Sequence, residues 1–484
     1  MIKTKIIATL GPATTKAENI KALIDSGVNV FRLNFSHGSL EEHADLLDTI
    51  NHLRSQSSHT LAVMGDLCGP KIRTSQIEHP QTASHGGPER RGNPGLKKGD
   101  EVVIVPNMET GTINRFGTNY EHFNRDIQPG DRVLIDDGQI ELRVIDKDDN
   151  QTTCTVIVGG FIQSHKGINL PDTKVSTPSI TERDWECVAW AVEHQLDYLA
   201  LSFVRTAEEI DHLKKHLRGQ GSPIKIISKI EKPEAIENLE SIVHISDVVL
   251  VARGDLGVEM DLAQVPLIQK RITKMCRRLG KPVIVATQML QSMIEAPVPT
   301  RAEVSDVANA IMDFADAVML SGETAVGEYP VEAVRTIKQI ARNTEAFMDE
   351  HNSPRPPIEA TDELAITATL ARSVAQIIDD VDARLVVTWS QTGGTARLLS
   401  KSRIDVPIIA FSSDELFCRQ MSLHYGVIPV HAELPVDTKD FISRAEKTIL
   451  AKKWAERFDR IIVLPGAALA DPPTSHTIML HTIS

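Results

Sequence analysis

The sequence predicts an α/β protein: a closed (β/α)8 barrel, the TIM-barrel architecture, with an inserted small β-barrel lid domain and a C-terminal α/β domain. Eight short apolar or β-branched runs alternate with amphipathic stretches. Near-continuous apolar runs indicate strands that are buried on both faces of a parallel sheet. Between Thr74 and Pro178 the apolar pattern changes from the helical period to the alternation of strands. With 484 residues, the chain also exceeds what a single core holds.

Each of the eight runs is expected to form one barrel strand, with helices between most of them. The strands are predicted at residues 5–10, 28–34, 61–66, 197–203, 224–230, 247–252, 282–287 and 316–321. Examples of the predicted helices are residues 16–26, 39–55, 181–194, 207–217, 263–279 and 331–348. A doubly wound open sheet is the alternative, but it rarely needs eight strands in a row, and no G-x-G-x-x-G follows the first strand. The closed barrel is therefore favoured.

The break in the pattern divides the chain into three domains. The barrel is predicted at residues 1–74 and 173–345, the inserted β domain at 75–172, and the C-terminal domain at 355–484. Within the insert, Asp136-Asp137-Gly138 predicts a hairpin turn, and residues 81–95 are expected to form a mobile loop. Residues 350–360 are expected to be a linker, and the strands after it are RLVVTW, VPIIAF, GVIPV and DRIIVLPG.

The composition restricts the classes of partner. The net charge of −13 disfavours nucleic acid and anionic membrane as partners. No apolar run reaches the roughly 18 residues of a membrane span, and the N-terminal run is too short for a signal peptide. The five cysteines form no C-x-x-C pair, which is typical of reduced thiols. We expect a cytoplasmic protein, in which an anionic substrate would need a local basic pocket.

Charged residues collect where the predicted strands end, which is where a (β/α)8 barrel does its chemistry. Lys229 and Glu231 lie two residues apart at the end of the fifth strand and share its inward face, and Asp255 follows the sixth. Two carboxylates with open positions suit Mg²⁺, and a lysine beside the metal can neutralise a phosphoryl group or a developing enolate. A structural ion pair of Lys229 with Glu231 or Asp255 is the alternative.

Other strand ends offer groups that can hold anions. The turn Arg253-Gly254-Asp255-Leu256-Gly257 has free N–H groups that could hold a carboxylate or a phosphate. Arg32, Arg73 and Lys166 are candidates for phosphate contacts. No G-x-x-x-x-G-K-[ST] motif occurs, so any nucleotide is bound without a P-loop.

Six stretches together resemble the pyruvate kinase family. They follow one another in order along the barrel: FRLNFSHG, IISKIEKPEAI, VARGDLGVE, VIVATQMLQSM, PTRAEVSDVANA and DAVMLSGETA. The resemblance continues through the insert to the C-terminal domain. It implies the reaction of phosphoenolpyruvate with ADP to give pyruvate and ATP, with Mg²⁺ or Mn²⁺ as cofactor. It also suggests a homotetramer.

The resemblance implies roles for matching residues of the phosphoryl-transfer machinery. Glu231 and Asp255 would be the Mg²⁺ ligands. Lys229 would meet the transferring phosphoryl group and stabilise the enolate, and Arg32 would hold the substrate phosphate. The residues implied to face the nucleotide are Asn34, His37, Arg73, Lys166 and, on the inserted lid, Asp137.

A second group of residues is implied to act on the rest of the substrate. The backbone at Gly254 and Asp255 would hold the substrate carboxylate. Thr287 would lie on the path that delivers a proton to the enolate carbon. Ser321 and Glu323, in the family's second barrel signature, would support that proton relay.

Lys71 distinguishes this chain within the resemblance. Many pyruvate kinases have a glutamate at this position and need a bound K⁺, held by Asn, Ser and Asp side chains and a threonine carbonyl. The matching residues here are Asn34, Ser36, Asp66 and Leu67. An ammonium on Lys71 could supply the same unit charge opposite Asp66. The resemblance therefore implies the bacterial-type, K⁺-independent subgroup, for which K⁺ is not required.

The C-terminal stretch TWSQTGGTAR resembles the family's phosphate-effector loop, and a sugar or nucleotide monophosphate is the expected effector. Its hydroxyl and glycine groups belong to Ser390, Thr392, Gly393, Gly394 and Thr395.

Two alternatives stay open for the whole protein. Barrel aldolases acting on pyruvate enolates share the metal ligands but lack the insert and the C-terminal domain. A non-catalytic regulator that kept the fold would be favoured by loss of Lys229, Arg32 or a metal carboxylate, and none of these residues is lost.

Overall fold

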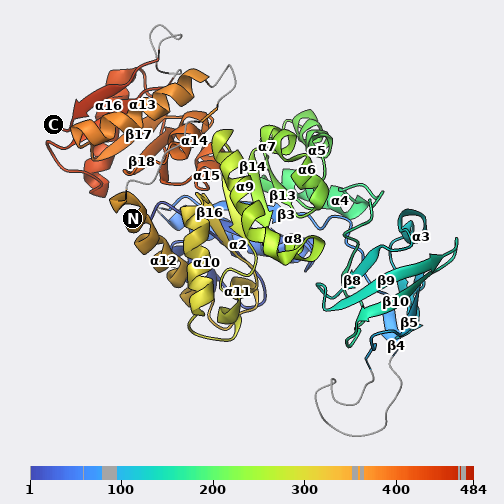
Figure 1. Cartoon of the computed structure of the whole chain (residues 1–484). Helices are drawn as coiled ribbons and strands as arrows, with labels where there is room; N and C mark the ends of the chain where they lie inside the picture. Colours follow the sequence, from blue (N-terminus) through green and yellow to red (C-terminus); the bar gives the residue numbers. More distant parts are fainter. Residues whose placement is uncertain are drawn as a thin grey trace.

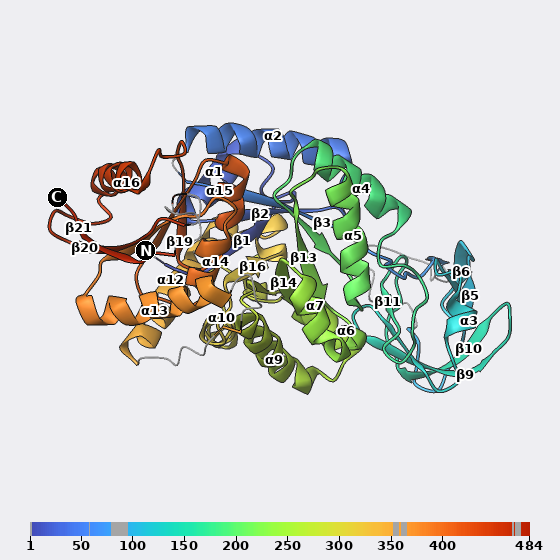
Figure 2. The ribbon, with the colours of Figure 1, turned by 90° about the horizontal axis from the view of Figure 1, so that it is seen from above.

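The central barrel lies between the inserted β domain on one side and the C-terminal α/β domain on the other (Figures 1 and 2). The computed structural model describes residues 2–57, 59–78, 95–351, 358–359, 365–466, 469 and 476–484. The predicted mobile loop, apart from its last residue, and most of the predicted linker lie outside the described residues. The predicted domain boundaries stay predictions. The elements below fall within them, except that the last barrel helix ends at Glu350 and so passes the predicted barrel end at 345.

Eight parallel strands close the barrel, so the predicted fold class is confirmed. Their order is β1-β16-β15-β14-β13-β12-β3-β2. Each lies within one predicted run: β1 (Lys5–Thr9), β2 (Val30–Asn34), β3 (Ala62–Asp66), β12 (Tyr198–Leu201), β13 (Lys225–Ile230), β14 (Val248–Ala252), β15 (Val283–Ala286) and β16 (Ala317–Leu320). Residues such as Met64 and Ile227 fill the interior, and their neighbours pack under the helices, which explains the continuous apolar runs.

The helices around the barrel agree with the amphipathic stretches. The predicted set corresponds to α1 (Ala17–Ser26), α2 (Leu40–Gln56), α4 (Glu182–Glu193), α5 (Ala207–Gly219), α9 (Val265–Arg278) and α12 (Pro330–Glu350). The structure adds α6 (Pro233–Glu237), α7 (Leu239–Ile245), α8 (Arg253–Glu259), α10 (Arg301–Met312) and α11 (Gly322–Ala325). A capping box of Thr300 with Glu303 begins α10, and this local signal could have predicted that helix.

The inserted domain is a second, curled sheet of eight strands in the order β11-β8-β9-β10-β5-β7-β6-β4. The strands are β4 (Gln76–Glu78), β5 (Glu101–Pro106), β6 (Thr110–Thr112), β7 (Arg115–Thr118), β8 (Arg132–Ile135), β9 (Ile140–Lys147), β10 (Thr152–Val158) and β11 (Ile168–Asn169), with the short helix α3 (Phe123–Asp126). Asp136 and Asp137 both have a φ of 55° and join β8 to β9, as the predicted hairpin turn requires.

The C-terminal domain has a five-stranded sheet in the order β19-β18-β17-β20-β21. Its elements are α13 (Ala365–Val381), β17 (Leu385–Trp389), α14 (Gly394–Lys401), β18 (Ile408–Ser412), α15 (Glu415–Met421), β19 (Val427–His431), α16 (Thr438–Lys452), β20 (Arg460–Leu464) and β21 (Met479–Thr482). The four predicted strands are present. The sequence prediction missed β21, an antiparallel edge strand whose apolar run is short.

Buried ion pairs join the C-terminal domain to the amino ends of the barrel strands. Asp316 lies 2.7 Å from Lys401 Nζ and 3.2 Å from Arg403 Nη2. Asp197 accepts a hydrogen bond from Arg419 Nε at 2.7 Å. The C-terminal domain therefore covers the floor of the barrel and leaves the opposite rim free.

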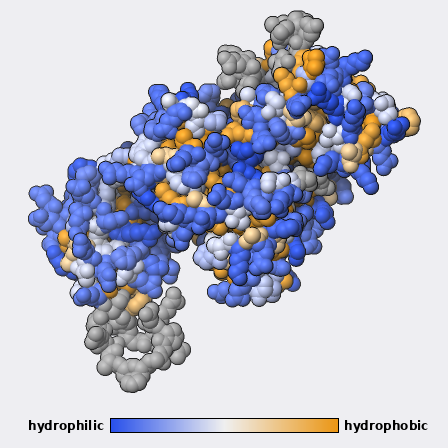
Figure 3. All heavy atoms as spheres, turned by 180° about the vertical axis from the view of Figure 1, so that it is seen from behind, coloured by the Kyte–Doolittle hydropathy of each residue, from blue (hydrophilic) through white to orange (hydrophobic). Residues whose placement is uncertain are grey.

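Hydrophilic residues cover most of the face seen in Figure 3, with smaller groups of hydrophobic residues between them. The large exposed apolar side chains include Leu262, just before α9, and Leu267 in the first turn of that helix. Within the described residues, no helix is long and apolar enough to cross a membrane.

Candidate active site

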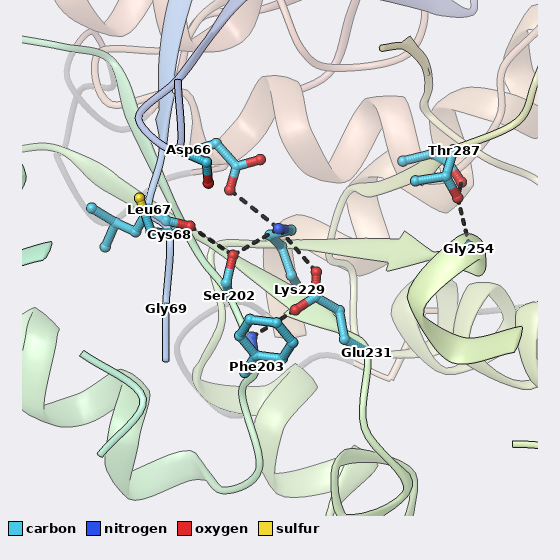
Figure 4. Close-up of polar contacts among 12 residues, drawn as sticks. Asp66, Leu67, Cys68, Gly69, Ser202, Phe203, Lys229, Glu231, Gly254 and Thr287 are labelled. Carbon is cyan, nitrogen blue, oxygen red and sulfur yellow. Dashed lines mark hydrogen bonds and ion pairs between the residues drawn. The ribbon is translucent and has the colours of Figure 1, made fainter. Parts of the chain in front are cut away.

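The candidate site lies where the barrel strands end at their carboxyl rim (Figure 4). β3 ends at Asp66, β13 carries Lys229 one residue before its end, and Glu231 follows β13 directly. Because parallel strands end at one rim, side chains that are distant in the chain meet there. The structure therefore brings Asp66, Lys229 and Glu231 together.

Asp66 is buried and faces two cations. Its Oδ2 accepts a hydrogen bond from Arg32 Nε at 2.7 Å, and its Oδ1 lies 3.3 Å from Lys229 Nζ. Burial raises the pKa of Asp66, but Lys229 and Arg32 outweigh it, so the pKa lies below its usual value. Arg32 is oriented further by a hydrogen bond from Nη1 to Thr9 Oγ1 at 3.1 Å. The Asp66 carboxylate thus stays charged and orients both cations.

Lys229 lies at the centre of the site. Its Nζ donates to Ser202 Oγ at 2.7 Å and lies 2.9 Å from Glu231 Oε1. Burial lowers the pKa of Lys229, but Asp66, Glu231 and Asp255 together raise it above its usual value. The ion pair of the structural alternative is therefore present, but it belongs to a larger group of charges at an open rim.

The two predicted metal ligands fit a divalent cation. Glu231 Oε2 accepts a hydrogen bond from the Phe203 N–H at 2.7 Å, whereas Asp255 has no hydrogen bond or ion pair through its side chain within the described residues. Burial and repulsion from neighbouring carboxylates raise the pKa of both groups, despite Lys229. No cluster of three or more His, Cys, Asp or Glu suited to a metal occurs in the described ranges. Glu231 and Asp255 would therefore hold a divalent cation together with water and substrate oxygens.

Gly254 and Thr287 lie together at the neighbouring strand ends (Figure 4). The Gly254 N–H donates to Thr287 Oγ1 at 2.7 Å, and Thr287 has a φ of 70°. Positive φ values are uncommon for β-branched residues and concentrate at functional sites. The Arg253 guanidinium holds this turn through a hydrogen bond to the Thr287 carbonyl at 2.8 Å. An anion at the Gly254 N–H would have to displace the Thr287 hydroxyl.

A cleft of about 310 Å³ separates the inserted domain from the barrel rim. The candidate residues that line it are Lys71, Arg73, Asp137, Lys166 and Asp255. Lys166 Nζ lies 2.9 Å from Asp136 Oδ1, and Arg73 Nη1 donates to the His165 carbonyl at 2.8 Å. Three cations beside the predicted metal ligand suit a polyanionic ligand.

Asn34 and His37 line a different cleft, of about 680 Å³, next to α2. Burial lowers the pKa of His37, and the nearby cations Lys71, Arg73 and Arg32 lower it further. The five residues implied to face the nucleotide are therefore divided between two neighbouring clefts.

Lys71 contacts the residues of the predicted monovalent-cation position without pairing directly to Asp66. Its Nζ donates to Ser36 Oγ at 3.0 Å, and the Ser36 N–H donates to Asn34 Oδ1 at 3.2 Å. The Leu67 carbonyl accepts a hydrogen bond from Ser202 Oγ at 2.7 Å. Desolvation and the nearby Lys229 lower the pKa of Lys71, while Asp66 opposes the shift.

Ser321 and Glu323 follow β16. Glu323 is buried, and its two carboxylate oxygens accept hydrogen bonds from the Leu290 N–H at 3.0 Å and the Ser321 N–H at 2.8 Å. These contacts hold two neighbouring loops in place. The implied role of both residues in a proton relay stays a prediction.

The candidate effector loop precedes α14 in the C-terminal domain. Gly393 has a φ of 82°, a conformation that favours glycine, and Ser390 Oγ accepts a hydrogen bond from the Ala396 N–H at 3.2 Å. Gly394 and Thr395 begin the helix, and Thr392 is exposed. The loop thus presents a hydroxyl beside a helix N-terminus, in an arrangement that suits a phosphate.

Sequence reasoning missed several residues that shape the site. Thr9 orients Arg32, Ser202 binds Lys229, and Phe203 donates its N–H to Glu231. Ser202 and Phe203 directly follow β12, so the rule that strand ends carry the chemistry could have found them. Lys232, which also lines the cleft beneath the inserted domain, follows Glu231 in the chain but gives no motif of its own.

Paired cations and carboxylates at the rim, beneath a separate β domain, define a barrel enzyme that acts on anionic substrates. A model of the pyruvate kinase barrel domain matches residues 1–334, and a model of the pyruvate kinase alpha/beta domain matches residues 368–481. Pyruvate kinases from Staphylococcus aureus strains MRSA252 and USA300 are each 39% identical to this chain, over 100% of it and 81% of the relative. A crystal structure of a pyruvate kinase from Cryptosporidium parvum has 34% identity and a TM-score of 0.88, covering 100% of this chain and 96% of its own. The chain belongs to the pyruvate kinase family and is a phosphotransferase.

Proposed function

We propose that this chain transfers the phosphoryl group of phosphoenolpyruvate to ADP and releases pyruvate and ATP, the last step of glycolysis. The observation that carries the proposal is Lys229, a buried ammonium between Asp66 and Glu231 in a chain related to pyruvate kinases over its whole length. Phosphoryl transfer needs positioning and charge neutralisation more than covalent chemistry. The rim supplies both.

Each charged group has a part in this reaction. Glu231 and Asp255 would hold Mg²⁺ or Mn²⁺, which supplies charge neutralisation to the phosphoryl oxygens. Lys229 neutralises the transferring group and then the enolate oxygen, and Arg32 holds the substrate phosphate. The first turn of α8 binds the substrate carboxylate, and Thr287 lies on the path of the proton to the enolate carbon.

We place the nucleotide phosphates in the cleft lined by Lys71, Arg73 and Lys166, beneath the inserted domain. Closure of that domain would exclude water from the reaction. Lys71 takes the place of a bound K⁺, which the contact with Ser36 and the field of Asp66 support. The enzyme would then need Mg²⁺ and no monovalent cation, as in the bacterial-type K⁺-independent subgroup.

Three further expectations stay predictions. The loop at 390–395 would bind a phosphorylated effector. The chain would assemble as a homotetramer, which light scattering of the purified protein tests. Its location would be the cytoplasm.

Pyruvate release from phosphoenolpyruvate, measured with and without ADP, tests the proposed reaction. Pyruvate should appear only with ADP and a divalent cation, and Asp255→Ala should abolish it without unfolding the protein. Asp261→Ala, which removes an exposed carboxylate just after α8, is the control and should keep wild-type turnover. Turnover near wild type in Asp255→Ala would refute the metal assignment. Pyruvate release that is independent of ADP would instead indicate transfer of the phosphoryl group to water, the reaction of a phosphatase, and would refute the proposed reaction with ADP.

A further inference from the structure

Glu259 forms a buried junction between the barrel and the inserted domain. It ends α8, one helical turn after Asp255, and is 2% exposed. Its Oε1 accepts hydrogen bonds from Lys232 Nζ at 2.6 Å and from Asn169 Nδ2 at 2.8 Å. Asn169 ends β11 in the inserted domain, so three segments meet at one carboxylate oxygen.

Lys232 extends this junction to the other predicted metal ligand. It follows Glu231 directly in the chain, and its Nζ lies 5.9 Å from the centroid of the Phe203 ring. The Phe203 N–H in turn donates to Glu231 Oε2 at 2.7 Å. The pair of Lys232 with Glu259 therefore joins the segment that carries Glu231 to the helix that carries Asp255.

Stability alone explains this ion pair poorly. The side chains of Lys232 and Glu259 are only 14% and 1% exposed, and Glu259 Oε2 is buried with no hydrogen-bond partner among the described residues. The desolvation of two buried charges commonly cancels their attraction, whereas such pairs can fix the register of the segments that they join. The pair here joins the two segments that carry the proposed metal ligands Glu231 and Asp255.

We propose that Glu259 is a positioning residue, which holds Glu231 and Asp255 at the spacing that a divalent cation needs and links this spacing to the inserted domain through Asn169. The inference rests on the proposed role of Glu231 and Asp255 as metal ligands. Residues that orient metal ligands without touching the metal typically change metal affinity by about 10- to 100-fold when they are substituted.

The affinity of the full-length, substrate-free protein for Mn²⁺ tests this inference without turnover. Glu259→Gln keeps the size and one acceptor but removes the charge, and it should weaken Mn²⁺ binding about tenfold, as measured by electron paramagnetic resonance of free Mn²⁺. Amide hydrogen exchange in α8 should also become faster. The matched control is Glu345→Gln, because Glu345 is a buried carboxylate at the opposite end of the barrel that accepts a hydrogen bond from the Thr4 N–H. It should leave Mn²⁺ affinity unchanged.

The proposal would be overturned if Glu259→Gln kept its Mn²⁺ affinity within about twofold of wild type and only lowered the melting temperature, as the control does. Glu259 would then have a purely structural role. Asp255→Asn separates this failure from failure of the proposed function. If Asp255→Asn still binds Mn²⁺ tightly, the metal site lies elsewhere and both proposals fall.

Asn169→Ala tests the link to the inserted domain. This variant keeps the Lys232–Glu259 pair and should weaken Mn²⁺ binding at least about twofold, less than Glu259→Gln does. Wild-type Mn²⁺ affinity would refute the link through Asn169.

Discussion

At the scale of single residues, the rim holds two kinds of charge. Asp66 has a lowered pKa and Lys229 a raised one, so both stay charged across the physiological pH range. Glu231 and Asp255 instead have raised pKa values, because burial and repulsion from neighbouring carboxylates penalise their negative charges. The charged Lys229 can therefore attract an anionic substrate. The carboxylates of Glu231 and Asp255 would be stabilised by a bound cation.

Lys229→Met should abolish phosphoryl transfer while Mg²⁺ and substrate still bind. The buried ammonium is expected to supply several kcal/mol of transition-state stabilisation, so turnover should fall by about 10³-fold or more. Steady-state pyruvate release measures this loss. Lys225→Met is the matched control, since Lys225 begins the same strand at the barrel floor. Substantial turnover in Lys229→Met would leave Lys229 as a member of a structural ion pair.

Lys71→Glu should create a requirement for K⁺ or abolish activity, whereas the wild-type enzyme should be fully active with Mg²⁺ alone. The substitution removes the ammonium that bonds to Ser36 and introduces the acidic side chain that the family resemblance associates with a bound K⁺. Turnover in tetramethylammonium salts, with and without K⁺, measures the effect, and Lys98→Glu on an exposed turn is the control. A wild-type enzyme that is silent in tetramethylammonium and revived by K⁺ would contradict the proposal.

Mg²⁺ should raise the melting temperature more at pH 8 than at pH 5. The folded-state pKa values of Glu231 and Asp255 lie above their ordinary values of 4.5 and 3.8. The metal-free fold therefore loses stability as the pH rises through those raised pKa values, and bound Mg²⁺ removes this cost. Scanning calorimetry with Mg²⁺ and with a chelator measures the difference. An equal rise at both pH values, or a pH-dependent rise that persists in Asp255→Asn, would contradict this assignment.

At the scale of elements, the turns after the strands carry the functional geometry. Phe203 after β12 and Thr287 after β15 have φ values of 54° and 70°. Such backbone strain persists only where the surrounding structure enforces it. Here it directs the Phe203 N–H at Glu231 and places the Thr287 hydroxyl beside Gly254.

The loop before α14 should bind a phosphorylated metabolite and shift the saturation curve for phosphoenolpyruvate. Its glycine N–H groups and hydroxyls suit a phosphate. Sugar and nucleotide monophosphates should be screened against wild type and Thr392→Ala. The control is Thr448→Ala, because the Thr448 hydroxyl donates to the Arg444 carbonyl within α16 at 3.0 Å. Thr392→Ala should lose the response. An effector that acts equally on both proteins has its site elsewhere.

At the scale of the whole molecule, buried ions connect the C-terminal domain to the barrel floor. Lys401 is 0% and Asp316 1% exposed at the side chain, and Asp316 Oδ2 also accepts a hydrogen bond from the Val283 N–H at 2.7 Å. The candidate effector loop leads into α14, and this contact joins the last residue of that helix to the start of β16. It offers a physical connection between the loop and the barrel.

Lys401→Met should lower the free energy of unfolding by about 3 kcal/mol, because it leaves the Asp316 charge buried with a weaker set of partners. Urea unfolding measures the change. The double variant with Asp316→Asn should recover part of the loss, since both charges are then absent. Strictly additive losses would show that the two residues do not interact energetically.

The sequence by itself determined the eight barrel strands and their order, six of the helices around them and the hairpin in the insert, and it predicted that charged residues collect at the rim. These follow from local patterns: apolar runs set buried strands, and charges gather just after them. Strand ends that carry Lys229 and Glu231 could therefore be predicted to face one site.

Only the tertiary structure decided which groups meet. Asp66 faces Lys229 because β3 and β13 both border β12 in the closed barrel, and Ser202 bridges them from the end of β12. Glu259 reaches Lys232 and Asn169 across three segments that no local pattern relates. The physical reason is that burial, and with it the pKa values and pairing of these charges, arises when the barrel closes and the inserted domain packs against its rim.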